Sequence, residues 1–175
     1  MNSFKSIQLI LILVASTAFN AQGQSSTEAL KDPCALLSSS FITSIDGFKK
    51  SNDGRKNLIS SDTWKVCDFL VDNNFLSVSL KRYDDRIIER KGVESTYQRI
   101  LKTQDQLTRA EVPNAPGDQA IYTYGKTNTP GKPYNFLLQW RYGNHTEGQI
   151  SISYGKKQDA DDMLNRLIKL AEKLD

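Results

Sequence analysis

Histidine and cysteine are scarce in this chain, and their scarcity limits the chemistry that it can perform. The 175 residues include one histidine, His145, and two cysteines, Cys34 and Cys67. Zinc sites in proteins use three or four ligands, so two thiolates and one imidazole would make a poor metal centre. A Cys–His or Ser–His–Asp site would depend on the same imidazole, and the GxSxG sequence of many serine hydrolases is absent. We therefore expect no metal ion and no histidine-based catalysis.

Patterns that mark nucleotide or nucleic-acid binding are also missing. The chain has no Gly-rich phosphate loop such as GxGxxG or GxxxxGKS/T, so no cofactor is expected. The formal net charge is only +3 at pH 7 and no basic block occurs, which offers no electrostatic footprint for nucleic acid. The basic residues at 49–56 are interrupted by Asp53 and are interpreted as a solvated loop.

Only one long apolar run occurs, and it lies at the amino terminus. Lys5 precedes the nine-residue run IQLILILVA at residues 7–15, and small and polar residues follow it. The run is too short for a membrane span, which needs about 20 apolar residues, but it has the layout of a secretory signal peptide. No later segment is long and apolar enough to span a membrane, so we expect an exported protein without a membrane span.

Small residues mark two positions at which such a signal peptide is cleaved, after Ala18 and after Gly23. Residues 1–23 are therefore predicted as the signal peptide, 24–31 as a flexible leader and 32–175 as a single domain. About 150 residues remain after cleavage, which is enough to bury one hydrophobic core.

The two cysteines are interpreted as a disulfide. A lipid anchor needs a cysteine directly after the apolar run, but no cysteine lies between Met1 and Pro33. In an exported chain, two cysteines most often pair with each other. Joining Cys34 to Cys67 closes a loop of 34 residues, counting both ends. Free thiols and a metal-binding pair are the alternatives. The expected location is periplasmic or extracellular, without a lipid anchor.

Local patterns predict three helices. Asp32 and Pro33 favour a helix start, apolar residues recur every fourth position after them, and Gly47 favours the end of that helix. Two later segments keep helical apolar spacing, and the last carries acidic residues near its positive end. The helices are expected over residues 33–46, 90–103 and 159–174.

Alternating apolar and polar residues predict about five strands, and residues 48–62 between the first helix and the first strand are expected to form an exposed loop. The element order is α-β-β-α-β-β-β-α, which is typical of an α+β domain with an antiparallel sheet covered by helices on one side. The strands are expected over residues 63–71, 75–83, 120–124, 136–142 and 149–154.

Polar residues on the last three strands are the candidate binding residues. Alternate aromatic residues of these strands are expected in the core, so the opposite face would carry hydroxyl, amide and guanidinium groups. Such a face suits a polar ligand or a protein partner, and an ordinary solvated face is the alternative. The candidate residues are Thr123, Gln139, Arg141, Ser151 and Ser153, extended by Ser77 and Ser79.

Two other features have simpler interpretations. The carboxylate pairs at 84–85 and 161–162 would be needed for glycoside hydrolysis, but neighbouring side chains diverge, and the second pair suits a helix start. The triplet at 144–146 matches the N-glycosylation sequence, which matters only in a host that glycosylates.

The opening DPCALLSSSFITSIDG resembles the D-P-C-x-L-L opening of small bacterial exported domains of unknown function, many of which are lipoproteins. In those domains a second cysteine falls in a strand after the first helix, as Cys67 does in KVCDF. The later GDQAIY is similar to their G-D-x-A-aromatic strand start. The resemblance covers residues 32–175 and implies a cysteine pair, an α+β fold and a role at the cell envelope. It implies no activity, and this chain lacks the lipidation cysteine.

The sequence therefore favours a non-enzymatic exported domain that binds a ligand or a protein partner at the cell envelope or outside the cell. One alternative is a secreted hydrolase that uses carboxylates and hydroxyls. Another is an inhibitor or immunity-type protein that binds through an exposed loop such as residues 126–135.

Overall fold

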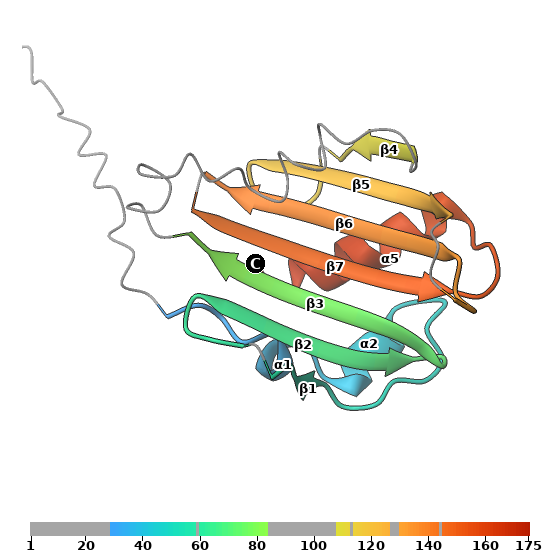
Figure 1. Ribbon diagram of the computed structural model, residues 1–175, viewed down its shortest axis with the longest axis horizontal. Coiled ribbons are helices and arrows are strands. Elements are labelled where there is room, and N and C mark those ends of the chain that lie inside the picture. Colours follow the sequence, from blue (N-terminus) through green and yellow to red (C-terminus); the bar gives the residue numbers. More distant parts are fainter. Residues whose placement is uncertain (1–28, 59, 84–107, 113, 127–129, 144) are drawn as a thin grey trace, which may run out of the picture.

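The computed structural model describes residues 29–58, 60–83, 108–112, 114–126, 130–143 and 145–175. Within these ranges, seven strands form one antiparallel sheet in the order β1-β2-β3-β7-β6-β5-β4, and three helices lie against one face of it (Figure 1). The strands are β1 (Arg55–Lys56), β2 (Trp64–Val71), β3 (Asn74–Arg82), β4 (Thr108–Glu111), β5 (Gln119–Lys126), β6 (Tyr134–Tyr142) and β7 (Thr146–Tyr154). The helices are α1 (Pro33–Leu36), α2 (Ser39–Ser44) and α5 (Ala160–Glu172).

Cross-strand register assigns the strand residues to two faces, because directly opposed residues of an antiparallel sheet project to the same side. One row of such partners crosses five strands and is buried throughout: Cys67, Val78, Ile150, Leu138 and Tyr122. Ile42 of α2 and Leu167 of α5 belong to the same apolar cluster. The helices and this core face therefore enclose the hydrophobic core, which confirms the α+β class and the antiparallel sheet.

The final helix forms where its apolar stripe predicted it. Met163, Leu167 and Leu170 are buried against the core face, and the Asp159 side chain caps the amino-terminal end of α5. Asp159 Oδ1 accepts hydrogen bonds from the Asp161 and Asp162 backbone N–H groups, at 3.0 Å and 2.9 Å.

Replacing Asp159 by alanine is expected to lower the free energy of unfolding by about 1 kcal/mol, because two backbone donors lose their acceptor. Asp159→Asn keeps a capping oxygen and serves as the matched control. Urea denaturation followed by circular dichroism measures both variants. Equal losses in the two variants would show that the cap does not stabilise α5.

The prediction of one continuous first helix was wrong. Leu37 and Ser38 adopt extended backbone angles, which divide the segment into α1 and α2. The Ser38 hydroxyl accepts a hydrogen bond from the Phe41 N–H at 3.1 Å, so Ser38 starts a second helix as its N-cap. The Leu37 side chain is buried in the core at this break. The hydrogen bond to the Ser38 hydroxyl and the burial of Leu37 together stabilise this break more than the helical spacing of the apolar residues favours one continuous helix.

The five predicted strands are confirmed, with several longer than expected, but the prediction of about five strands was too low. The structure adds β1, a pair of exposed residues in the segment expected to be a loop, and β4 at the opposite edge of the sheet. Both are short edge strands, which carry little apolar alternation to reveal them. The helix predicted over residues 90–103 lies outside the described residues.

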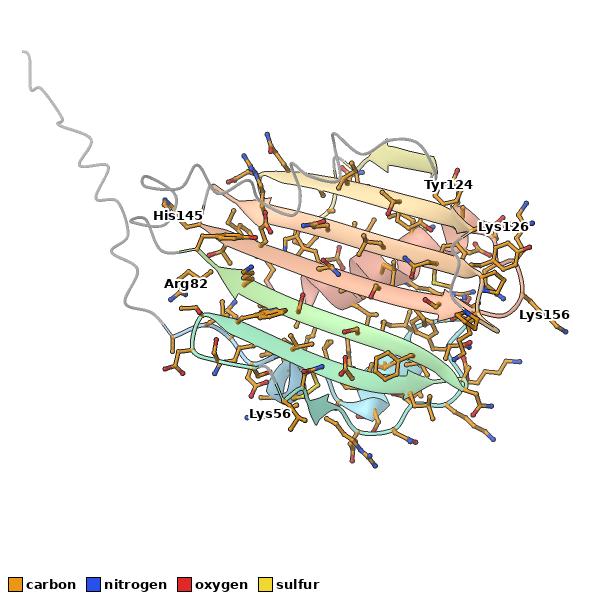
Figure 2. All side chains as sticks on the ribbon, viewed as in Figure 1. Lys56, Arg82, Tyr124, Lys126, His145 and Lys156 are labelled. Carbon is orange, nitrogen blue, oxygen red and sulfur yellow. A yellow bond between two sulfur atoms is a disulfide. The ribbon has the colours of Figure 1, made fainter. Side chains whose placement is uncertain are left out.

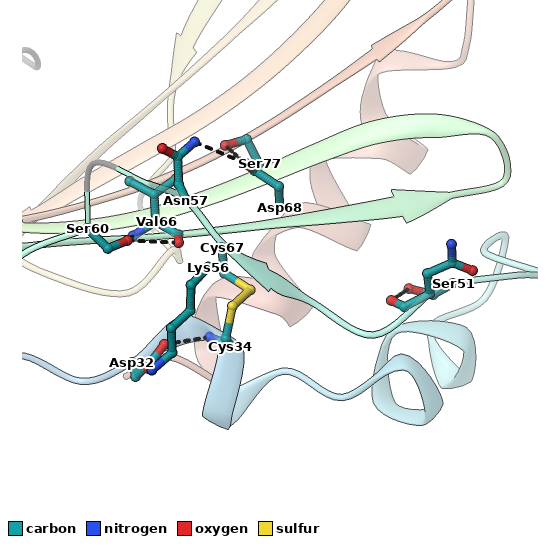
Figure 3. Close-up of a disulfide and its surroundings, with 11 residues drawn as sticks. Asp32, Cys34, Ser51, Lys56, Asn57, Ser60, Val66, Cys67, Asp68 and Ser77 are labelled. Carbon is teal, nitrogen blue, oxygen red and sulfur yellow. Dashed lines mark hydrogen bonds and ion pairs between the residues drawn. A yellow bond between two sulfur atoms is a disulfide. The ribbon is translucent and has the colours of Figure 1, made fainter.

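The predicted disulfide joins Cys34 of α1 to Cys67 of β2, with a Cα–Cα distance of 5.3 Å (Figure 3). Asp32 reinforces the link, because it accepts a hydrogen bond from the Cys34 N–H at 3.0 Å and pairs with Lys56 Nζ of β1 at 2.7 Å. Burial acts to raise the pKa of the Asp32 carboxyl, but these two partners outweigh it and lower the pKa. The alternatives of free thiols and a metal-binding pair are thereby excluded.

Candidate functional site

All five predicted binding residues lie on the sheet face opposite the helices, which we call the polar face. Its central rows, as the register places them, carry Thr123 of β5, Gln139 and Arg141 of β6, and Ser151 and Ser153 of β7. The structure thus brings the predicted set to one side of three neighbouring strands. Their exposure differs, however. Gln139 is 1% exposed and Thr123 is 3% exposed, whereas the other three are half-buried.

Hydrogen bonds within the sheet already occupy part of this face. Ser153 Oγ donates to Asn135 Oδ1 at 2.9 Å, and Ser77 Oγ donates to Asp68 Oδ1 at 2.7 Å. The polar face therefore satisfies several of its own hydroxyl groups across the strands. This pattern agrees with a structural role for these serines as well as with a binding role.

A buried carboxylate that the sequence patterns did not single out also lies on the polar face. Glu147 of β7 is directly opposed to Lys81 on one side and to Arg141 on the other, and its Oε2 accepts a hydrogen bond from the Tyr83 hydroxyl at 2.8 Å. Within the described part of the chain, three buried side-chain oxygens lack a hydrogen-bond partner: Thr123 Oγ1, Gln139 Oε1 and Glu147 Oε1. Their near-complete burial keeps them out of reach of a ligand in solution.

A pocket lies elsewhere, on the helix-covered side at one end of the sheet. This end pocket encloses a volume of about 630 Å³ between the ends of β5 and β6 and the start of α5. Figure 2 shows Tyr124 and Lys126 at this end of the sheet, far from His145. The described residues that line the end pocket are Tyr124, Gly125, Lys126, Tyr134, Phe136, Lys157, Gln158, Asp159 and Ala160.

The register explains why aromatic side chains gather there. Tyr124 is directly opposed to Phe136, and Lys126 is directly opposed to Tyr134, so all four project to the core face. Helix α5 begins at Ala160, and this residue lines the pocket together with the strand ends and the three residues that precede the helix. The half-buried Tyr124 and Tyr134 side chains form pocket walls, and the buried Phe136 ring belongs both to the wall and to the core.

Ring contacts hold the aromatic walls in place. The Tyr124 ring stacks on that of Tyr122 with a centroid distance of 5.2 Å, and Phe136 meets Tyr154 edge to face at 6.1 Å. The Tyr122 hydroxyl donates to the Ala160 carbonyl oxygen at 2.8 Å. Burial, followed by the proximity of Tyr124 and Asp161, raises the pKa of the Tyr122 phenol, so it remains a hydrogen-bond donor at neutral pH. The pocket walls are thus built before any ligand arrives.

Charged groups line the rim of the end pocket. Lys126 Nζ lies 5.9 Å from the centroid of the Tyr134 ring, and Lys157 approaches from the β7–α5 connection. Asp159 is the acidic residue of the described lining, and its Oδ1 is engaged by the first backbone N–H groups of α5. The arrangement combines an apolar ring surface with two ammonium groups.

A second cavity lies at the other end of the core face and is much smaller. It encloses about 170 Å³ near Leu80, Trp140 and the carboxyl-terminal residue Asp175. The Tyr142 hydroxyl and Lys31 Nζ both donate to Asp175, which closes this end with internal contacts. Small-molecule sites commonly enclose about 300–1,000 Å³, so the end pocket is the better candidate.

One of the two carboxylate pairs considered for hydrolysis lies within the described residues. Asp161 and Asp162 are exposed in the first turn of α5, where acidic residues favour the helix, and the pair at 84–85 lies outside the described residues. In the described ranges, no group of three His, Cys, Asp or Glu residues is placed to hold a metal ion.

None of the helices in the described residues is long and apolar enough to cross a membrane.

Comparison with protein-family models and with curated protein sequences found no match to this chain. The resemblance of its DPCALL opening to bacterial exported domains therefore stays a proposal.

Proposed function

We propose that this protein is a non-enzymatic exported domain that binds a small molecule with an apolar ring in the end pocket. The observation that carries the proposal is a cavity of about 630 Å³ walled by Tyr124, Tyr134 and Phe136. Ligand sites are typically concave, largely apolar and lined by aromatic side chains with a few polar groups. The ring contacts behind Tyr124 and Phe136 support a wall that needs no rearrangement to accept a ligand.

The proposed location is the periplasm or the extracellular space, without a lipid anchor. The signal-peptide layout of residues 1–23 supports export, and the Cys34–Cys67 disulfide suits an oxidising compartment. Kinship with bacterial exported domains that open on D-P-C-x-L-L is part of the same proposal. The loop considered for an inhibitor, residues 126–135, contributes Lys126 and Tyr134 to the pocket, so its ends already have a role in ligand binding.

A neutral fluorescent probe, N-phenyl-1-naphthylamine, tests the proposed function. We expect saturable binding of one probe molecule per chain, measured by the rise in probe fluorescence. Tyr124→Ala should weaken binding about fivefold, because one aromatic contact is lost.

Phe75→Ala is the matched control for this experiment. Phe75 is 53% exposed on the polar face and does not line the pocket, so its loss should leave probe binding unchanged. Absence of saturable binding would contradict the proposed function. Equal effects of the Tyr124 and Phe75 substitutions would contradict the assignment of the site.

A further inference from the structure

The charges around the end pocket identify the class of ligand more closely. We infer, on the basis of the proposed function, that the ligand carries an anionic group next to its ring. The anionic group is held between Lys126 and Lys157. The ring lies against Tyr124, Tyr134 and Phe136. The chemistry is that of a small aromatic or alicyclic carboxylate, sulfonate or phosphate.

The two lysines reach the pocket from segments that are distant in the sequence. Lys126 is the last residue of β5, and Lys157 lies between β7 and α5. The ion pairs found within the described ranges are Lys56–Asp32 and Lys65–Asp62, so neither pocket lysine is neutralised by one of them. Both ammonium groups are therefore available to an anion at the same rim.

The Asp159 carboxylate of the lining offsets one of these two charges, so the charged residues of the described lining keep one net positive charge. Asp159 turns its Oδ1 toward the backbone donors of α5, where it accepts two hydrogen bonds. Asp161 and Asp162 are exposed in the first turn of the same helix, and Lys156 adds a further cation beside Lys157. Asp159 is thus held at the helix end by its two hydrogen bonds, whereas no ion pair of the described residues holds Lys126 or Lys157.

A cationic ligand fits the same surroundings poorly. Aromatic walls attract cations, but the Tyr134 ring already has Lys126 Nζ beside it at 5.9 Å. A second cation in the pocket would also meet the charge of Lys157. An anion, in contrast, gains from both lysines without displacing the ring contacts.

Two probes with the same ring system separate the anion preference from binding itself. 1-Anilinonaphthalene-8-sulfonate carries a sulfonate that N-phenyl-1-naphthylamine lacks, and both are titrated into the purified protein. At low salt we expect the sulfonate probe to bind about fivefold more tightly than the neutral probe, because its sulfonate gains two partly exposed charge contacts, with Lys126 and Lys157. The preference should largely disappear at about 1 M salt, where the screening length falls to about 3 Å.

Charge-removing variants then locate the anion. Lys126→Gln and Lys157→Gln should each weaken binding of the sulfonate probe about threefold more than they weaken binding of the neutral probe. Lys156→Gln removes the neighbouring charge, which does not line the pocket, and should have little effect on either probe. Tyr124→Ala should weaken both probes.

The outcomes distinguish the two proposals. Equal affinities for the two probes would overturn the anion preference and leave the proposed function standing. Binding of neither probe would overturn the proposed function and the inference together. Equal losses in Lys126→Gln, Lys157→Gln and Lys156→Gln would show a general charge effect and would overturn the assignment of the anion to the pocket.

Discussion

Replacing both cysteines by alanine is expected to lower the free energy of unfolding by about 3–4 kcal/mol. The Cys34–Cys67 disulfide closes a long loop, and its removal frees that loop in the unfolded chain. Helix α1 has only four residues, too few to be stable on its own, so the disulfide is the main covalent constraint that keeps it on the sheet. Alanine is preferred to serine because Cys67 is fully buried and a hydroxyl there would lack partners.

Urea denaturation of the oxidised protein, the reduced protein and the double variant measures this effect. The reduced protein is the matched control and should unfold at nearly the same urea concentration as the double variant. Thiol titration of the denatured, unreduced protein should detect no free thiol. A variant as stable as the oxidised protein would show that the disulfide adds nothing to the stability of the fold.

The second large effect is expected at Gly148 of β7. A β-carbon built there would lie 2.2 Å from the Cε2 and Cζ2 atoms of Trp140, which is directly opposed to Gly148 on β6. Trp140 is almost completely buried and belongs to the core cluster, so displacing its indole would disturb its packed neighbours. Gly148→Ala is therefore expected to cost about 2–3 kcal/mol, the cost of overpacking a tight core.

A double-mutant cycle with Trp140→Leu tests the cause of this loss. Trp140→Leu removes the clashing ring and is itself destabilising, but Gly148→Ala should then cost less than about 1 kcal/mol in that background. Thermal and urea denaturation of the four proteins supply the cycle. An equal cost of Gly148→Ala in both backgrounds would show that contact with the indole is not the reason for glycine at this position.

Several parts of the fold follow from local sequence alone. Strands β2 and β3 and the turn between them, strands β6 and β7, and helix α5 form where short-range periodicity predicted them. The pairing of Cys34 with Cys67 follows from the cysteine count in a chain with a signal-peptide layout. Each of these features depends on residues within one segment, or on there being only one possible partner.

The sides of the sheet were also predictable in part. Alternation placed Thr123, Gln139, Arg141, Ser151 and Ser153 on one face, and the register confirms that they share it. Alternation does not determine how deeply a residue is buried, however. Thr123 and Gln139 proved almost inaccessible because burial depends on which segments pack against a face, a long-range property.

The local sequence of residues 1–175 thus determined the helix and strand segments with strong periodicity, the cysteine pairing and the sidedness of the sheet. Only the tertiary structure decided the break between α1 and α2, the edge strands β1 and β4, and the end pocket. The pocket joins Tyr124 and Lys126 of β5 to Tyr134 of β6 and Lys157 before α5. Its existence depends on how α5 is placed over the strand ends. The residue at which α5 begins follows from local sequence, but its placement on the sheet is set by packing between segments that are distant in the sequence.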